Sequence, residues 1–235
     1  MTQLRFALAQ IDTCVGALDA NAAKVLDYSR KAAAGNAQVV VFPEMTLTGY
    51  PIEDLALRRT FRQAAWDKAN ELATQLNDDG LGDLFVVVGT VGTDRKTSKP
   101  RNRLVVLHQG VVWAGYDKHF LPNYGVFDEF RIFSAGDRSV TLDVDGATIG
   151  VAICEDIWQD AARWPTWPPR TSTCCSPSTA RRMRKARPTP VSSSPSVVPP
   201  RLRPGHLPES GRRSRDLVFD GGSFVVDATA RLSNA

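Results

Sequence analysis

Three side chains with complementary chemistry lie where apolar runs of the sequence end. Glu44 follows the run VVVFP, Lys118 follows VVWAGYD, and Cys154 follows GVAI. A cysteine attacks a carbonyl carbon only as the thiolate, so it needs a base for its proton and positive charge nearby. A glutamate can take that proton, and a lysine can stabilise both the thiolate and the oxyanion of a tetrahedral intermediate. Together these residue types would cleave an amide through a thioester.

These residue types also have ordinary structural interpretations. A cysteine at the end of an apolar strand is more often a packing residue, and an acid or lysine at such an end is usually solvated. A Cys–His enzyme is less favoured, because His108 lies within a hairpin, His119 is next to Lys118, and His206 lies in a stretch without periodicity. Cys14 precedes a small-residue loop and has no evident base. No spacing of Cys, His or carboxylates predicts a metal site.

Helices and buried strands alternate along the first half of the chain. Apolar periodicity predicts helices over 19–34, with Asp19 as the N-cap, and over 60–76. A strand is expected at 4–11, and continuous apolar runs over 37–44 and 84–92 are typical of strands buried on both faces. We therefore expect a layered α/β arrangement.

Two β-hairpins should complete the strands that carry the lysine and the cysteine. They span 102–118 and 139–154, with turns at Gln109-Gly110 and Asp145-Gly146. The pattern indicates an α/β domain with more than one sheet. Strand ends converge on the crevices of such folds, so residues far apart in sequence can meet there. If EDIW after the cysteine opens a helix, its positive end would favour the thiolate.

Composition divides the chain into unlike parts. The chain has 235 residues, 43% of them hydrophobic, which is enough for a sizeable core. Residues 161–215 hold twelve Lys and Arg, one acid and eleven of the 15 prolines, whereas the rest carries 17 basic and 24 acidic side chains. The net charge of +4 thus averages an acidic globular part and a basic, proline-rich segment, and is no evidence of nucleic-acid binding.

The remaining bulk features favour a cytoplasmic protein. Four cysteines in a chain of this length make no disulfide framework, which favours a reducing compartment. No run approaches the roughly 18 apolar residues of a membrane span. The N-terminal MTQLRFALAQID alternates like a strand and lacks the features of a signal peptide. We expect no membrane association.

The contexts of the three candidate residues resemble the motifs of the nitrilase, or carbon–nitrogen hydrolase, superfamily. They are VVVFPEMTLTGYP, YDKHFLPNYGVFDEFRIF and GVAICEDIW, in the family's order. Within that superfamily, GYPIEDLALR, KHFLPNYGVFDEFRIFSAG and DLVFDGGSFVVD resemble the N-terminal glutaminase domain of bacterial glutamine-dependent NAD synthetases. The likeness covers residues 1–160 and 216–229. The resemblance implies an αββα sandwich, with two mixed sheets face to face between helix layers and the second half disrupted here.

The resemblance also implies roles for single residues. Glu44 would be the general base, Lys118 the oxyanion stabiliser and Cys154 the nucleophile. Tyr124 would help to hold glutamine, and Glu129 would support the lysine.

Two acids of the cysteine motif have less specific implied roles. Of Glu155 and Asp156, one would cap a helix and the other would orient the site.

Substrate and partners follow from the same resemblance. L-glutamine would be the substrate, and the glutaminase step would need no cofactor. ATP and Mg would belong to a synthetase domain that receives the ammonia, and no Ser-Gly-Gly-x-Asp-Ser-like loop of such a domain occurs in the sequence. The intact family commonly forms homo-oligomers. The alternatives are a stand-alone nitrilase-type amidase, or a non-catalytic fragment whose basic segment binds a partner, with Trp164 and Trp167 as possible base-stacking residues.

The segment 161–215 departs from the family pattern. Relatives continue with a buried strand and a segment like LLLSLNxSPY, whose serine contacts glutamine, whereas this chain has CCSPSTARRM. A permitted codon set for Cys174–Pro190, translated one base earlier, gives LLLSLNGSPYAEGAADT. We therefore expect 161–215 to be out-of-frame translation and disordered, with the hydrolase pattern returning over 216–235. Arg181 would replace the serine, and poor stability and little glutaminase activity are expected.

Overall fold

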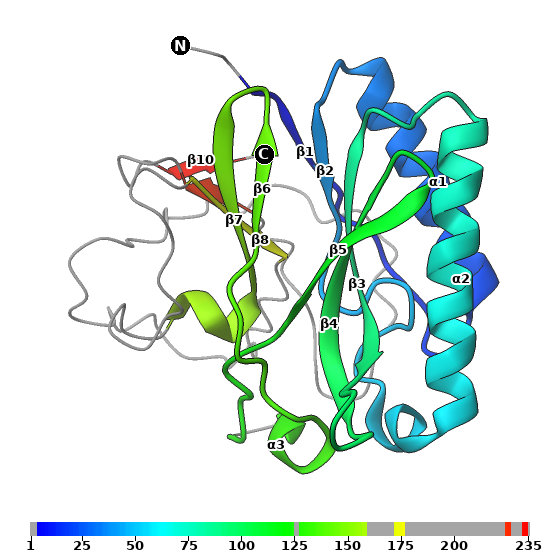
Figure 1. The fold of residues 1–235 in the computed structure, drawn as a ribbon, viewed down its shortest axis with the longest axis vertical. Coiled ribbons are helices and arrows are strands. Elements are labelled where there is room, and N and C mark those ends of the chain that lie inside the picture. Colours follow the sequence, from blue (N-terminus) through cyan, green and yellow to red (C-terminus); the bar gives the residue numbers. More distant parts are fainter. Residues whose placement is uncertain (1–3, 125–126, 159–171, 177–223, 227–231, 235) are drawn as a thin grey trace, which may run out of the picture.

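The structure is a computed structural model that describes residues 4–124, 127–158, 172–176, 224–226 and 232–234. The described part forms two five-stranded sheets with helices on one side (Figure 1). Most of the expected out-of-frame segment, 161–215, lies outside these residues. The prediction of a frame shift therefore remains a prediction.

The first sheet has the strand order β1-β2-β3-β4-β5 and mixed direction. β1, β2 and β3 are parallel, whereas β3, β4 and β5 are antiparallel. The bounds of its strands are β1 Phe6–Leu8, β2 Val39–Val41, β3 Phe85–Thr93, β4 Pro100–His108 and β5 Val111–Asp117. The continuous apolar runs thus occupy the centre of the sheet, where both faces are covered.

Two long helices cover one face of this sheet. They are α1, Leu18–Ala34, and α2, Arg59–Asp78. Their apolar stripes, which include Val25 and Leu72, pack on strand residues such as Val40. Since side chains alternate along a strand, Val39 and Val41 point to the opposite face.

The second sheet has the order β10-β9-β8-β7-β6 and lies against that opposite face (Figure 1). Its strands are β6 Thr141–Val144, β7 Ala147–Ile153, β8 Ser172–Ser176, β9 Phe224–Val226 and β10 Leu232–Asn234. β7 and β8 are parallel, and the other pairs are antiparallel. Leu142, Ile149 and Val151 of this sheet form one core with Val39 and Val41 of the first. The described part is thus a layered α–β–β structure with two mixed sheets face to face.

The two predicted hairpins are confirmed at their turns. β4 and β5 are joined by Gln109 and Gly110, with φ angles of 49° and 77°. β6 and β7 are joined by Asp145 and Gly146, with φ angles of 48° and 79°. Positive φ at both central residues is the conformation whose twist matches antiparallel strands.

The predicted helix cap was wrong. α1 begins at Leu18, with Ala17 in the N-cap position and no side chain capping it. Leu18 packs against two core clusters, so the helix starts one residue earlier than predicted. Asp19 is therefore inside the first turn, where its carboxylate pairs with Lys68 of α2 at 2.7 Å.

Three short elements did not follow from sequence periodicity. A 3₁₀ helix, η1, spans Glu53–Leu57, and a single helical turn, α3, spans Glu129–Ile132. β8 lies inside the segment for which no regular element was predicted, and pairs with β7 from Ile149↔Ser172 to Ile153↔Ser176. The parallel partner strand of β7 thus forms at the place where the resemblance implies one.

Candidate active site

Glu44 lies on a segment that leaves β2 and runs across β3. Phe42 N–H donates to the Val87 carbonyl, and Leu47 N–H donates to the Gly89 carbonyl, both at 2.9 Å. A Cβ at position 89 would collide with the backbone of Met45, so only glycine lets the segment lie this close to the strand. This contact buries Glu44, which is 3% exposed, at the end of the two sheets where β2 and β5 end and β4 begins.

Lys118 follows directly after β5 and is held by both its backbone and its side chain. Its backbone N–H donates to the Asn102 carbonyl of β4 at 2.8 Å. Its Nζ donates to Oε1 of Glu44 at 2.7 Å and to the two carboxylate oxygens of Glu129 at 3.0 and 2.9 Å. Its side chain is 1% exposed. We call Glu44, Lys118 and Glu129 the charged centre.

Glu129 reaches the charged centre from α3, a turn separated from the end of β5 by eleven residues. The Tyr50 hydroxyl donates to its Oε1 at 3.1 Å. Gly136, further along the chain, donates its N–H to the Lys118 carbonyl at 2.8 Å, and a Cβ there would collide with the Asp117 carbonyl. The segment that follows Glu129 is thus fixed against the end of β5.

Burial and charge set the protonation of the charged centre. Burial alone would lower the pKa of Lys118, but the carboxylates of Glu44 and Glu129 outweigh it and hold this pKa well above its ordinary value. Burial raises the pKa of the Glu129 carboxyl to about 7, the charge of Glu44 adds to the shift, and the Lys118 ammonium opposes it. The lysine is therefore a permanent cation between two acids that compete for it.

Cys154 begins a sharp turn directly after β7. It has a φ of 42°, in the left-handed region that residues with a Cβ seldom adopt, and it starts the 3₁₀ helix η2, Cys154–Trp158. The EDIW segment thus forms a 3₁₀ turn as far as Trp158, and whether it opens a longer helix depends on residues outside those that the structure describes. The side chain is half-buried, and its charge is among those that raise the pKa of Lys118.

Asp156 joins the cysteine turn to the lysine segment. Its Oδ1 accepts the backbone N–H groups of His119 at 3.0 Å and Phe120 at 2.8 Å, directly after Lys118. Its Oδ2 accepts the Tyr116 hydroxyl at 2.7 Å and the Ile153 N–H at 3.1 Å, directly before the cysteine. One buried carboxylate thus fixes the end of β7 against the end of β5.

Tyr124 and Glu155 meet at the edge of this site. The Tyr124 hydroxyl donates to Oε2 of Glu155 at 2.7 Å. Burial raises the pKa of Tyr124, and this hydrogen bond raises it further. Tyr124 is 58% exposed, whereas Glu155 is 8% exposed. The structure thus places two more of the predicted residues side by side, with the tyrosine facing outward.

Two polar residues of the site were not recognised in the sequence. Asn102 of β4 donates its amide to Glu44 and Glu129, and Tyr50 donates to Glu129. The signal for Asn102 was available, because its position in PRNRLVVLH shares a face with Leu104 and Val106, which point into the core between the sheets. A polar side chain on a core-facing strand position is unusual unless it has partners there.

The raised pKa of Glu129 predicts a pH-dependent stability. The pKa of Glu129 in the folded state, about 7, exceeds the ordinary value of 4.5. Its contribution to the free energy of unfolding is therefore largest below pH 4.5 and is lost as the pH rises through 7. Glu129→Gln should remove this loss. Urea unfolding at pH 5 and pH 8 should show a smaller pH dependence in this variant than in the parent. Glu71→Gln, on the exposed face of α2, is the matched control. If the free energy of unfolding changed between pH 5 and pH 8 as much in Glu129→Gln as in the parent, the prediction would be contradicted.

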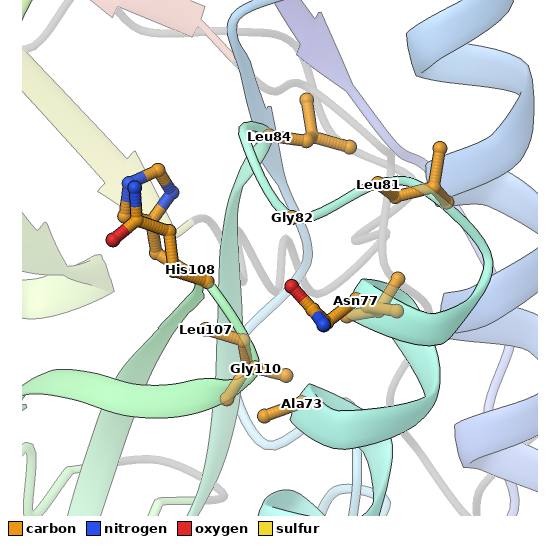
Figure 2. Close-up of a pocket in the computed structure, with 10 residues that line it drawn as sticks. Ala73, Asn77, Leu81, Gly82, Leu84, Leu107, His108 and Gly110 are labelled. Carbon is orange, nitrogen blue, oxygen red and sulfur yellow. The ribbon is translucent and has the colours of Figure 1, made fainter.

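A small hollow elsewhere has none of these side chains. It lies between the end of α2 and the β4–β5 turn, where Asn77 extends between Gly82 and Gly110 (Figure 2). Within the described residues, no group of three or more His, Cys, Asp or Glu side chains could hold a metal ion. No helix of that part of the chain has the length and apolar character needed to cross a bilayer.

Comparisons with known proteins show the family to which the chain belongs. The family model described as "Carbon-nitrogen hydrolase" matches residues 5–167. The glutamine-dependent NAD(+) synthetase of Acinetobacter baylyi is 31% identical over 244 residues, which cover 97% of this chain and 41% of the relative. The chain thus spans about two fifths of the length of such relatives.

Solved structures show the same fold. A glutamine-dependent NAD+ synthetase from Acinetobacter baumannii matches with a TM-score of 0.72 at 24% identity, covering all of this chain and 44% of that one. A nitrilase-superfamily amidase from Nesterenkonia, in a mutant form, matches with a TM-score of 0.65 at 18% identity, covering 99% of this chain and 86% of that one. The layered sheets are therefore those of the nitrilase superfamily.

Proposed function

Since the chain belongs to the carbon–nitrogen hydrolase family, we propose that it is the glutamine-hydrolysing part of a glutamine-dependent NAD synthetase. The observation that carries the proposal is the buried charged centre beside the Cys154 turn. It supplies a base, a cation and a sulfur at one end of the two sheets. The relatives' printed name supports glutamine as the amide.

The proposed reaction uses these groups in turn. Glu44 takes the thiol proton, and the sulfur of Cys154 bonds to the side-chain amide carbon of glutamine while Lys118 stabilises the oxyanion. The C–N bond then breaks, and the proton held by Glu44 goes to the leaving ammonia. Water adds to the glutamyl thioester, the C–S bond breaks, and glutamate and the thiol are released. No cofactor enters this step.

The wider assignment rests on the relatives. Ammonia would pass to an ATP- and Mg-dependent synthetase domain, in a cytoplasmic and oligomeric protein. A second helix layer outside β6–β10 would complete the αββα sandwich. In this chain, the composition of 161–215 and Arg181 in place of a substrate-contacting serine support weak turnover.

A test that does not depend on turnover is covalent labelling of Cys154. The 235-residue chain is treated with 6-diazo-5-oxo-L-norleucine, an electrophilic glutamine analogue, and digested with trypsin. Cys154 is the only cysteine of the tryptic peptide 139–163, and the exposed Cys14 serves as an internal reference in another peptide. We expect adduct on Cys154 well before Cys14, with protection by free L-glutamine.

Other outcomes separate the alternatives. Fast labelling of Cys154 by iodoacetamide without protection by glutamine would favour an amidase for another small amide. Labelling of Cys154 no faster than Cys14 by either reagent would contradict any hydrolase function of this chain.

A further inference from the structure

Asn102 occupies a central place in the site that the proposed reaction does not use. It lies on β4, is 1% exposed, and contacts all three members of the charged centre. Its amide nitrogen donates to Oε1 of Glu44 at 2.5 Å and to Oε2 of Glu129 at 3.4 Å. Its backbone carbonyl accepts the N–H of Lys118. One residue of a rigid strand thus touches each charged group.

The orientation of the amide follows from the chemistry around it. The amide nitrogen faces two carboxylates, and the amide oxygen in its place would meet only other acceptors. The lysine ammonium carries one positive charge and is shared by two acids. A second, neutral donor therefore lowers the cost of keeping both acids ionised in a buried site.

The two oxygens of Glu44 are used unequally. Oε1 accepts from both Lys118 and Asn102. Oε2 is buried and accepts no hydrogen bond from any described residue. A buried carboxylate oxygen that accepts no hydrogen bond destabilises the folded state, unless a donor reaches it when substrate reacts. In the proposed reaction that donor is the thiol of Cys154, whose charge acts on Lys118 of the same centre.

We propose that Asn102 is the positioning residue of the charged centre. It holds Glu44 by one oxygen only, and thereby reserves Oε2 for the proton of Cys154. It also holds the carboxylate of Glu129 on the lysine, so that this acid does not take the place of Glu44. The inference rests on the proposed function, because it specifies how the base of that reaction is oriented.

The charged and titratable groups facing this network come from several segments. They are Glu44 and Tyr50 after β2, Lys118 after β5, Glu129 of α3, and Cys154 and Asp156 after β7. Of these, the two glutamates lie within hydrogen-bonding distance of the Asn102 amide. Loss of the amide should make these glutamates hold a proton more strongly.

The test compares Asn102→Leu and Asn102→Asp with the parent chain. The leucine removes both donors at similar size, and the aspartate puts a third carboxylate in their place. Iodoacetamide labelling of Cys154 is followed by mass spectrometry of peptide 139–163 from pH 5 to 9, with Cys14 as the ordinary thiol in the same sample. Asn21→Leu is the matched control, because Asn21 is also fully buried and donates to the carbonyls of Cys14 and Leu47.

We expect the acid limb of the Cys154 labelling profile to move to higher pH by about one unit in Asn102→Leu and further in Asn102→Asp. At pH 6 the labelling rate should fall about tenfold in Asn102→Leu, since one pH unit corresponds to a factor of ten. Asn21→Leu should lower the melting temperature and leave the Cys154 profile where it is in the parent.

The outcomes separate this inference from the proposed function. A parent profile with a reactive Cys154, together with unchanged profiles in both Asn102 variants, would overturn the positioning role and leave the proposed function standing. Unfolding of both Asn102 variants under conditions where Asn21→Leu folds would assign Asn102 to stability alone and would also overturn it. If Cys154 follows Cys14 at every pH in the parent, the proposed function fails, and the inference fails with it.

Discussion

Replacing Lys118 with methionine is expected to lower the free energy of unfolding by about 3–5 kcal/mol at pH 8, because it leaves two buried carboxylates without their cation. Methionine has nearly the same length and keeps the aliphatic contacts. Glu44 and Glu129 would then face each other across an apolar side chain while both are only 3% exposed. Urea unfolding followed by circular dichroism measures the change.

The pH dependence of this effect is part of the prediction. At pH 5 the two glutamates of Lys118→Met can take up protons, so the destabilisation should be smaller than at pH 8. Lys68→Met is the matched control, because Lys68 pairs with the exposed Asp19 and Glu71 and should contribute no more than about 1 kcal/mol. If the free energy of unfolding of Lys118→Met lay within about 1 kcal/mol of that of the parent at pH 8, the charged centre would not be formed in solution.

Glu44→Gln should slow the reaction of Cys154 with the diazo ketone glutamine analogue by about 10²–10⁴-fold, the usual range for loss of a general base. Glutamine keeps the shape of the side chain, and its carbonyl oxygen can still accept from Lys118. It has no oxygen that can take up the thiol proton. The initial rate of labelling of peptide 139–163 at pH 8 gives the comparison directly.

Two further variants test whether the slower labelling of Cys154 is specific to Glu44. Glu129→Gln should slow labelling less, because the structure gives that acid contacts with Lys118 and Tyr50 as a support of the lysine. Glu71→Gln should leave the rate unchanged. A loss in Glu129→Gln equal to or greater than that in Glu44→Gln would exchange the roles proposed for the two acids.

The parts of the fold set by local sequence were predictable. The two hairpins formed at Gln-Gly and Asp-Gly turns, where the residue types tolerate positive φ. The three-valine β2 lies within the predicted run and is buried throughout, as continuous apolar runs imply. The sequence also predicted that the ends of separate buried strands can converge, and the structure brings Glu44 and Lys118 to 2.7 Å from one another.

The parts that depend on distant partners were not predictable. α3 is four residues long, too short to show a period, and its place depends on Glu129 reaching Lys118. β8 has no alternation of its own and exists by pairing with β7. Asn102 shows the limit most clearly: its strand was predicted, but which acids its amide would meet depends on segments 58 and 27 residues away.

The hydrogen bonds of the charged centre and of Asp156 join residues between 44 and 156, and the core between the sheets is built from residues 4 to 154. On a ribosome, where N-terminal parts fold first, this centre can therefore assemble before the proline- and arginine-rich stretch leaves the exit tunnel. None of these hydrogen bonds involves a residue beyond 156. The order of synthesis would thus favour formation of the charged centre ahead of completion of the second sheet.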